Sequence, residues 1–258
     1  MTDAAQTPEA HITVRNLDMA YGDFVIQRDL NFSIRRGDIF IIMGGSGCGK
    51  STLLRHLVGL QAPARGRVLY FGESLWEAEP ERRDAILRKT GVTYQAGGLW
   101  SSMTLAENVA LPLEQYTDLK PADIADLASL NLALVGLSGF EDYFPAQISG
   151  GMQKRAGLAR AMALSPEVLL FDEPSAGLDP ISSRLLDDLI LELRDSFGAT
   201  IVMVTHELAS IFAVGNNSVF LDPETKTQIA LGPPKQLLAE CLDPKVQRFL
   251  RRGEPAAE

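Results

Sequence analysis

The segment from Gly44 to Thr52 constrains the fold of this chain more than any other stretch of the sequence. It fits the spacing G-x-x-x-x-G-K-[ST] and consists of Gly44, Gly45, Ser46, Gly47, Cys48, Gly49, Lys50, Ser51 and Thr52. An apolar run, 39–43, precedes it, and an amphipathic run, 53–58, follows it. The sequence therefore predicts a buried strand, a phosphate-binding loop and a helix, within an α/β domain that has a mostly parallel sheet.

The residue types of this loop suit a bound triphosphate. Glycines let the chain turn tightly and bring successive N–H groups toward one anion at a helix N-terminus. Lys50 would reach the β- and γ-phosphates, and the Ser51 hydroxyl would sit on Mg²⁺. The helix dipole and Lys50 are expected to lower the pKa of the Cys48 thiol. We expect a nucleoside triphosphate here; an ordinary glycine-rich turn is the alternative.

Charge and cysteine content narrow the class of protein. The net charge of −9 over 258 residues argues against the broad basic surface of a nucleic-acid binder. Of the two cysteines, Cys48 and Cys241, one lies inside the loop, so no structural disulfide is expected and a reducing compartment fits. Residues 1–10 lack the apolar core of a signal peptide, and no apolar run approaches the roughly 20 residues that span a bilayer. Any membrane part is expected in another chain.

The hydrophobic pattern predicts how the rest of the chain is organised. Runs 11–19 and 24–34 alternate and precede the loop without a helix between them, which predicts a small antiparallel layer. Wholly apolar runs at 168–171 and 200–205 predict parallel strands that are buried on both faces. Helices are predicted at 105–113, 121–134 and 151–164, and a closing hairpin at 219–222 and 228–231. The predicted single domain, 1–258, has an α/β core with the β layer (1–95 and 166–233), a helical subdomain (96–165) and a helical C-terminal tail (234–258).

Two further motifs carry chemistry. The strand at 168–171 ends in Asp172 and Glu173, which places both carboxylates at the sheet edge where ligands of open α/β sheets bind. Asp172 suits Mg²⁺, and Glu173 is then free to deprotonate an attacking water; an acidic turn that caps a helix is the alternative. Ser149 can cap a helix whose first turn holds Gly150 and Gly151, a second anion site unless it is merely a capped helix.

The order of these motifs resembles the ATPase subunit of ATP-binding-cassette (ABC) transporters over nearly the whole chain. The order is the phosphate loop, a lone Gln95, the Ser149 helix, the Asp172 strand and then His206 after an apolar strand. The other histidines, His11 and His56, are expected at the surface or on a helix face.

The resemblance implies a role for each matching residue. Tyr21 would stack on adenine, and Gln95 would touch Mg²⁺ and sense the membrane partner. Ser149, Gly150 and Gly151 would close on the γ-phosphate of ATP that is bound to the other subunit of a homodimer. Asp179 would cross the dimer seam, and His206 would contact the γ-phosphate beside the catalytic residues Glu173 and Lys50. Met152 stands where the family usually has glutamine.

The segments 95–104 and 107–113, Met152 and the tail 243–250 resemble the ATPases of Mla/Mce-type phospholipid transporters, with Trp100 where those relatives usually have phenylalanine. The resemblance implies a peripheral protein on the cytoplasmic face of the inner membrane. It would power phospholipid transport for outer-membrane lipid asymmetry with integral membrane permease subunits and an Mce-type lipid-binding subunit. The alternatives are another cargo (amino acid, metal or lipoprotein) or a non-transport ABC ATPase that acts on nucleic acid. Leu99, Trp100 and Met103 are expected to form either a groove for a helix of the membrane subunit or a local hydrophobic staple.

Overall fold

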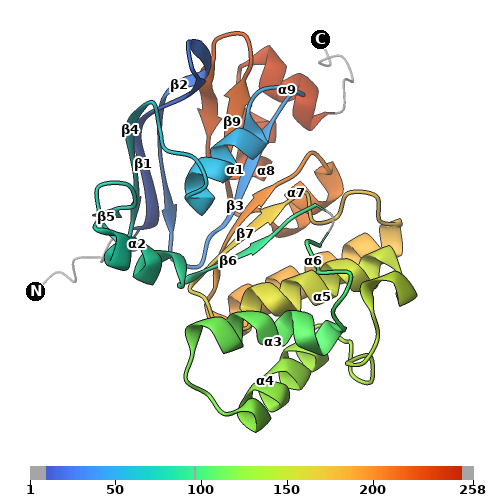
Figure 1. The fold of residues 1–258 in the computed structure, drawn as a ribbon. Helices are drawn as coiled ribbons and strands as arrows, with labels where there is room; N and C mark the ends of the chain where they lie inside the picture. Colours follow the sequence, from blue (N-terminus) through green and yellow to red (C-terminus); the bar gives the residue numbers. More distant parts are fainter. Residues whose placement is uncertain (1–9, 96, 252–258) are drawn as a thin grey trace, which may run out of the picture.

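Two sheets form the frame of the molecule in the computed structural model, which describes residues 10–95 and 97–251 (Figure 1). The larger, six-stranded sheet has the order β10-β9-β3-β8-β7-β6. Five of its strands are parallel to their neighbours, and β10 closes the edge as the antiparallel half of the predicted hairpin. Its strands are β3 (Ile39–Gly44), β6 (Thr90–Thr93), β7 (Val168–Asp172), β8 (Thr200–Val204), β9 (Asn217–Asp222) and β10 (Thr227–Leu231). The predicted α/β class with a mostly parallel sheet is confirmed.

The second sheet is the predicted antiparallel layer, with the order β2-β1-β4-β5. Its strands are β1 (Ala10–Tyr21), β2 (Phe24–Arg35), β4 (Arg65–Tyr70) and β5 (Glu73–Ser74). Helix α1 (Lys50–Val58) packs between the two sheets, because Leu53, Leu54 and Leu57 share one buried cluster with residues of both. The two sheets thus hold the helix that follows the phosphate loop from opposite sides (Figure 1).

Between the two predicted core segments, 1–95 and 166–233, the described residues form helices and loops. After α2 (Pro80–Leu87) and β6 come α3 (Leu105–Tyr116), α4 (Pro121–Leu134), the short 3₁₀ helix at Pro145–Gln147 and α5 (Gly150–Met162). No strand occurs among the described residues from 97 to 165. Helix α3 runs three residues past its predicted end despite Pro112, and Thr104 and Glu107 form a capping box at its start. The boundaries of the helical subdomain remain a prediction.

The remaining helices cover the other face of the large sheet and form the tail. They are α6 (Pro180–Phe197), α7 (Leu208–Val214), α8 (Pro234–Glu240) and α9 (Pro244–Leu250). The predicted helical tail consists of two helices rather than one, because the Asp243 carboxylate accepts from Lys245 N and Val246 N and caps α9 anew. Residues 252–258 of that tail lie outside the described part. Within the described part, no helix combines the length and apolar character needed to cross a membrane.

Candidate functional site

The loop between β3 and α1 has the backbone geometry of a phosphate cradle. Gly44 has φ +148°, and a Cβ there would lie 2.4 Å from the Leu221 carbonyl oxygen. Gly49 has φ +95°, and a Cβ there would lie 2.6 Å from a methyl carbon of Ile26. Any larger side chain at these two positions would push the loop away from β9 and β2. Lys50 Nζ donates to the carbonyl oxygens of Gly44 (3.0 Å) and Gly45 (3.1 Å), so the ammonium lies over the loop.

Cys48 does not have the environment predicted for it. The side chain is 1% exposed, and burial raises the pKa of its thiol, although the Lys50 ammonium 4.0 Å from the sulfur acts in the opposite direction. The predicted low pKa is wrong because the thiol faces the inside of the loop, where the cost of burying a thiolate exceeds the attraction of one lysine.

Asp172 and Ser51 form the polar pair expected of a magnesium site. Ser51 lies close enough to the Asp172 carboxylate to lower its pKa, while Asp172 Oδ1 is buried without a partner among the described residues. Burial raises the pKa of Asp172, and the neighbouring Glu173 charge raises it further. A buried carboxylate with one unpartnered oxygen beside a hydroxyl fits a hard cation with oxygen ligands. Gln95 follows the parallel strand next to β7 and lies exposed at the same sheet edge, in a turn.

Glu173 and His206 form the second polar pair of the site. Glu173 has φ +48°, a left-handed conformation that costs about 1–3 kcal/mol in a non-glycine residue. Its N–H donates to the Val204 carbonyl (2.9 Å), which turns the chain off the end of β7. Glu173 Oε2 lies 2.8 Å from His206 Nδ1, with the glutamate side chain 19% exposed and the histidine 54% exposed. The histidine thus holds one carboxylate oxygen at the rim of the phosphate loop.

Two hollows flank the loop, and Ser51 lines both of them. The first, of about 380 Å³, is lined by the residues from Ser46 to Thr52 except Cys48, together with Glu173, Phe24–Ile26, Pro223 and Lys226. The second, of about 660 Å³, contains Tyr21, Tyr94 and Asp172 in its lining. Tyr21 is about half exposed, and its hydroxyl accepts from Arg55 Nη1 at 3.3 Å. The loop, both carboxylates and an exposed aromatic ring therefore meet in one region.

Ser149 and Asp179 begin two neighbouring helices and do not line either hollow. Ser149 Oγ accepts from Met152 N (3.3 Å) and caps α5, and Asp179 caps α6 through Ser182 N (3.0 Å). A Cβ on Gly151 would lie 3.6 Å from Ser182, so the starts of α5 and α6 are neighbours. Neither cap is among the described residues that line the two hollows.

The segment after Gln95 is fastened to the helical part by contacts that the sequence did not indicate. Arg160 of α5 donates to the Gly98 carbonyl at 2.6 Å, and a Cβ on Gly157 would lie 2.5 Å from the Gly97 carbonyl. Asn108 is fully buried; it accepts from Trp100 N (2.7 Å) and donates to the carbonyls of Trp100, Met103 and Thr104. In the sequence, Asn108 looks like an ordinary polar residue of a helix. Only its burial in the structure shows that it holds the backbone of residues 100–104. These contacts tie residues 97–104 to α3 and α5.

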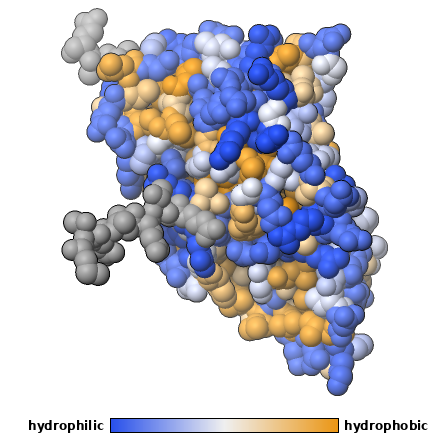
Figure 2. Space-filling view, turned by 90° about the vertical axis from the view of Figure 1, so that its left-hand side faces the viewer, coloured by the Kyte–Doolittle hydropathy of each residue, from blue (hydrophilic) through white to orange (hydrophobic). Residues whose placement is uncertain are grey.

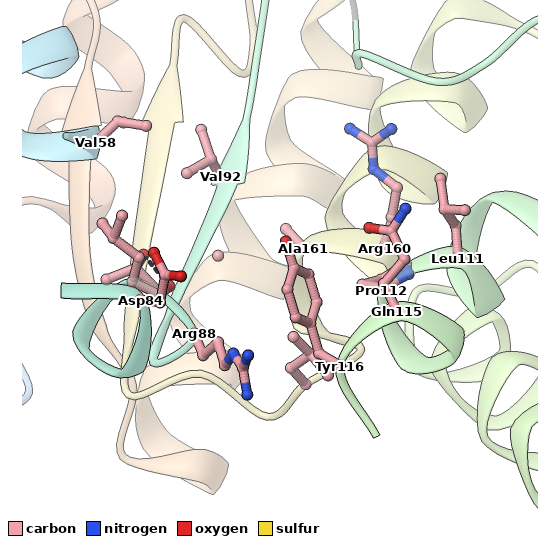
Figure 3. Close-up of a pocket in the computed structure, with 14 residues that line it drawn as sticks. Val58, Asp84, Arg88, Val92, Leu111, Pro112, Gln115, Tyr116, Arg160 and Ala161 are labelled. Carbon is pink, nitrogen blue, oxygen red and sulfur yellow. Dashed lines mark hydrogen bonds between the residues drawn. The ribbon is translucent and has the colours of Figure 1, made fainter. Parts of the chain in front are cut away.

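A pocket of about 440 Å³ opens between α2 and β6 on one side and α3 and α5 on the other (Figure 3). Arg88 extends from the end of α2 with its guanidinium 5.0 Å from the ring of Tyr116 on α3. Arg160, which holds the Gly98 carbonyl, also lines this pocket. Leu99, Trp100 and Met103 do not line this pocket. Leu99 packs on the core, and Trp100 is 59% exposed. Figure 2 shows further apolar surface on the lower, helical part of the molecule.

Comparisons with known proteins agree with this geometry. A family model described as ABC transporter matches residues 27–176. The probable ribonucleotide transport ATP-binding protein mkl of Mycobacterium tuberculosis is 38% identical over 93% of this chain, which spans only 66% of that relative. The intermembrane phospholipid transport system ATP-binding protein MlaF of Escherichia coli (strain K12) is 35% identical over 93% of this chain and 88% of its own length.

Solved structures give the same result for the fold. A dimeric structure of the ATP-binding cassette MJ0796, in a post-hydrolysis state with ADP and Pi, superposes with a TM-score of 0.78 at 28% identity, covering 86% of this chain and 98% of that one. The structure of cbiO1 from Clostridium perfringens, part of the ABC transporter complex cbiONQ, superposes with a TM-score of 0.82 at 26% identity and covers 96% of both chains.

Proposed function

Because the chain belongs to the ABC transporter family, we propose that it is the ATP-hydrolysing subunit of a transporter that moves phospholipid. The observation that carries the ATPase proposal is the contact between Glu173 Oε2 and His206 Nδ1 at the rim of the phosphate loop. A loop that binds phosphate needs no carboxylate beside it, whereas attack of water on a γ-phosphate needs a base and a well-placed charge.

Each residue of the site has a distinct role in this reaction. Lys50 and the backbone N–H groups of the loop bind the β- and γ-phosphates. Glu173 orients the attacking water and accepts its proton, and His206 fixes the carboxylate and reaches toward the γ-phosphate. Ser51, Asp172 and Gln95 would hold Mg²⁺, which neutralises charge on the phosphate oxygens when bound. Tyr21 offers its exposed ring to adenine.

We infer that a second copy of the chain completes the site. The Ser149–Gly151 segment and Asp179 lie together and line neither hollow at the chain's own phosphate loop. Two copies in opposite orientation would bring the start of α5 of one copy to the triphosphate of the other, where the helix N-terminus favours negative charge. The dimeric form of the structural relative MJ0796 supports this arrangement.

We propose that the pocket between α2, β6, α3 and α5 receives a helix of an integral membrane permease (Figure 3). Its walls come from the core and from the helical part, so an inserted helix would act on both. Arg160 lines the pocket and bonds to Gly98, three residues beyond Gln95. A displacement in the pocket would therefore reach Gln95 and the magnesium site.

The proposed cargo, location and further partner follow the MlaF relative, which this chain covers over most of its length. The protein would be peripheral on the cytoplasmic face of the inner membrane, would serve outer-membrane lipid asymmetry, and would work with permeases and an Mce-type lipid-binding subunit. The name of the mycobacterial relative supports a second candidate cargo, a ribonucleotide.

Co-purification of the complete complex from membranes tests the proposal. Mass spectrometry of what co-purifies should find phospholipid, and vesicles that contain the complex should transfer labelled phospholipid only with ATP. The Lys50→Ala complex is the matched control and should transfer none. Transfer of labelled ribonucleotide but not lipid would favour the second cargo, and transport by the Lys50→Ala complex would refute the ATPase role.

A further inference from the structure

Gln27 of β2 is a buried polar residue that none of the roles above uses. Its side chain is fully buried, and Nε2 donates to two backbone carbonyls, that of Cys48 in the phosphate loop (2.8 Å) and that of Asp222 at the end of β9 (3.0 Å). The Oε1 atom has no partner among the described residues. The amide cannot be turned over, because both neighbours are carbonyl oxygens and only an N–H group can bond to them.

The contact with Cys48 fixes the direction of an N–H group in the cradle. A trans peptide is planar, and its C=O and N–H point in opposite directions. When Gln27 holds the Cys48 carbonyl on the β2 side, the N–H of Gly49 must point to the other side of that peptide. Gly49 has φ +95° and immediately precedes Lys50, so its own preference does not fix this direction.

The second contact gives Gln27 a rigid support. Asp222 ends β9, and its carboxylate accepts from Thr225 N (2.9 Å), Thr225 Oγ1 (2.8 Å) and Lys245 Nζ of α9 (2.8 Å). The side chain of Asp222 is only 3% exposed. The Asp222 carbonyl thus belongs to a braced turn, and Gln27 transfers the position of that turn to the loop.

We propose that Gln27 is a positioning residue for phosphate binding: it orients the Cys48–Gly49 peptide so that the Gly49 N–H faces the bound nucleotide. The inference rests on the proposed ATP binding and adds to it a residue that does not touch ATP. It also accounts for the unpartnered Oε1. A buried polar atom without a partner costs about 1–3 kcal/mol, and an apolar side chain would avoid that cost but could not hold the carbonyl.

Equilibrium binding of fluorescent ATP and ADP to the full chain tests the proposal, with Gln27→Met as the principal variant. Methionine has a similar length and no donor, so both nucleotides should bind about 3- to 10-fold more weakly, the effect of one lost hydrogen bond. Gln228→Met is the matched control: Gln228 bridges β10 to Asn31 of β2 (2.6 and 2.9 Å), and it does not line the hollow at the loop. This control should bind both nucleotides as the wild type does.

Gln27→Glu supplies a second, pH-dependent readout. Only a protonated carboxylic acid can donate to a carbonyl, so nucleotide affinity in this variant should fall as the pH rises, while the affinity of Gln27→Met relative to wild type should stay constant. A purely structural role predicts a lower melting temperature without nucleotide and unchanged dissociation constants for the folded variants.

The outcomes separate this inference from the proposed function. Wild-type affinity in Gln27→Met, or equal losses in Gln27→Met and Gln228→Met, would overturn the positioning role while leaving ATP binding intact. If Gln27→Met does not fold, a pH-independent affinity in Gln27→Glu would overturn it instead. Failure of the wild type itself to bind ATP would overturn the proposed function and this inference with it.

Discussion

Replacing Glu173 with glutamine isolates the proton-accepting role of the carboxylate. Glutamine has the same shape, and its amide oxygen can still accept from His206 Nδ1, which lies 2.8 Å from the present Oε2. The substitution leaves Ser51 and Asp172 unchanged, as well as the contacts of Lys50 with the loop. The substitution therefore removes the base and leaves the nucleotide cradle in place.

The size of the effect follows from what a positioned base contributes. General-base catalysis is typically worth 10²–10⁴-fold, which corresponds to about 3–5 kcal/mol of the barrier. The Glu173 side chain is 19% exposed, so solvent water can take over part of the role, and the lower end of the range applies. We expect Glu173→Gln to hydrolyse ATP about a hundredfold more slowly. Its affinity for ATP should match that of the wild type.

Phosphate release in single turnover and equilibrium binding of fluorescent ATP measure the two quantities separately. Glu207→Gln is the control, because Glu207 Oε1 lies 3.6 Å from the other ring nitrogen of the same histidine. It should retain most of the activity. Turnover by Glu173→Gln near the wild-type rate, or an equal loss in Glu207→Gln, would refute the assignment of Glu173 as the base.

Three further predictions concern the surroundings of the site. Burial alone would raise the pKa of Asp222, but hydrogen bonds from Lys245 and Thr225 outweigh it and lower the pKa to about 2 from the usual 3.8. The resulting stability is present above the unfolded pKa and is lost as pH falls through about 2. In urea unfolding, the difference between wild type and Asp222→Asn in the free energy of unfolding should therefore disappear in that pH range. Because Cys48 is buried with a raised pKa and Cys241 is partly exposed, mass spectrometry should find Cys241 alkylated first by iodoacetamide. Gly157→Ala should lower stability in the same urea assay, because overpacking against the loop carbonyl 2.5 Å away costs about 1–3 kcal/mol and helix propensity returns only about 1.

Features that depend on neighbouring residues in the sequence were predictable. Helix α4 begins at Pro121 and ends at Leu134 as predicted, since Pro favours the first helical position and apolar spacing defines its buried face. The antiparallel layer followed from two alternating runs without a helix between them. Spacing alone likewise placed the phosphate loop and the pair Asp172–Glu173.

Features set by tertiary packing were not predictable. His11 and His56 were expected at the surface or on a helix face; His56 does lie on α1, but both side chains are buried. His11 Nδ1 lies 2.8 Å from the Thr200 hydroxyl, and His56 Nδ1 lies 2.7 Å from the Gln61 carbonyl. Leu185 of α6 is 56% exposed, although Leu186, Leu189 and Leu193 of the same helix are buried. None of these environments leaves a periodic signal in the sequence.

Gln27 shows most clearly why a pattern of alternation was insufficient. Leu30, Phe32 and Ile34 face the core, so strict alternation would place residue 27 on the solvent side. The pairing of β2 with β1 shifts between Leu17–Leu30 and Met19–Gln27, where Asp29 has φ +48°, and this bulge turns Gln27 inward. One extra residue in an antiparallel strand thus changes which side chain meets the phosphate loop. Deleting Asp29 should remove the bulge and leave Gln27 two positions from Leu30, on the same inward face of the strand. If Gln27 positions the loop as proposed, this deletion should therefore retain nucleotide binding that Gln27→Met weakens, and an equal loss in both variants would contradict the proposal.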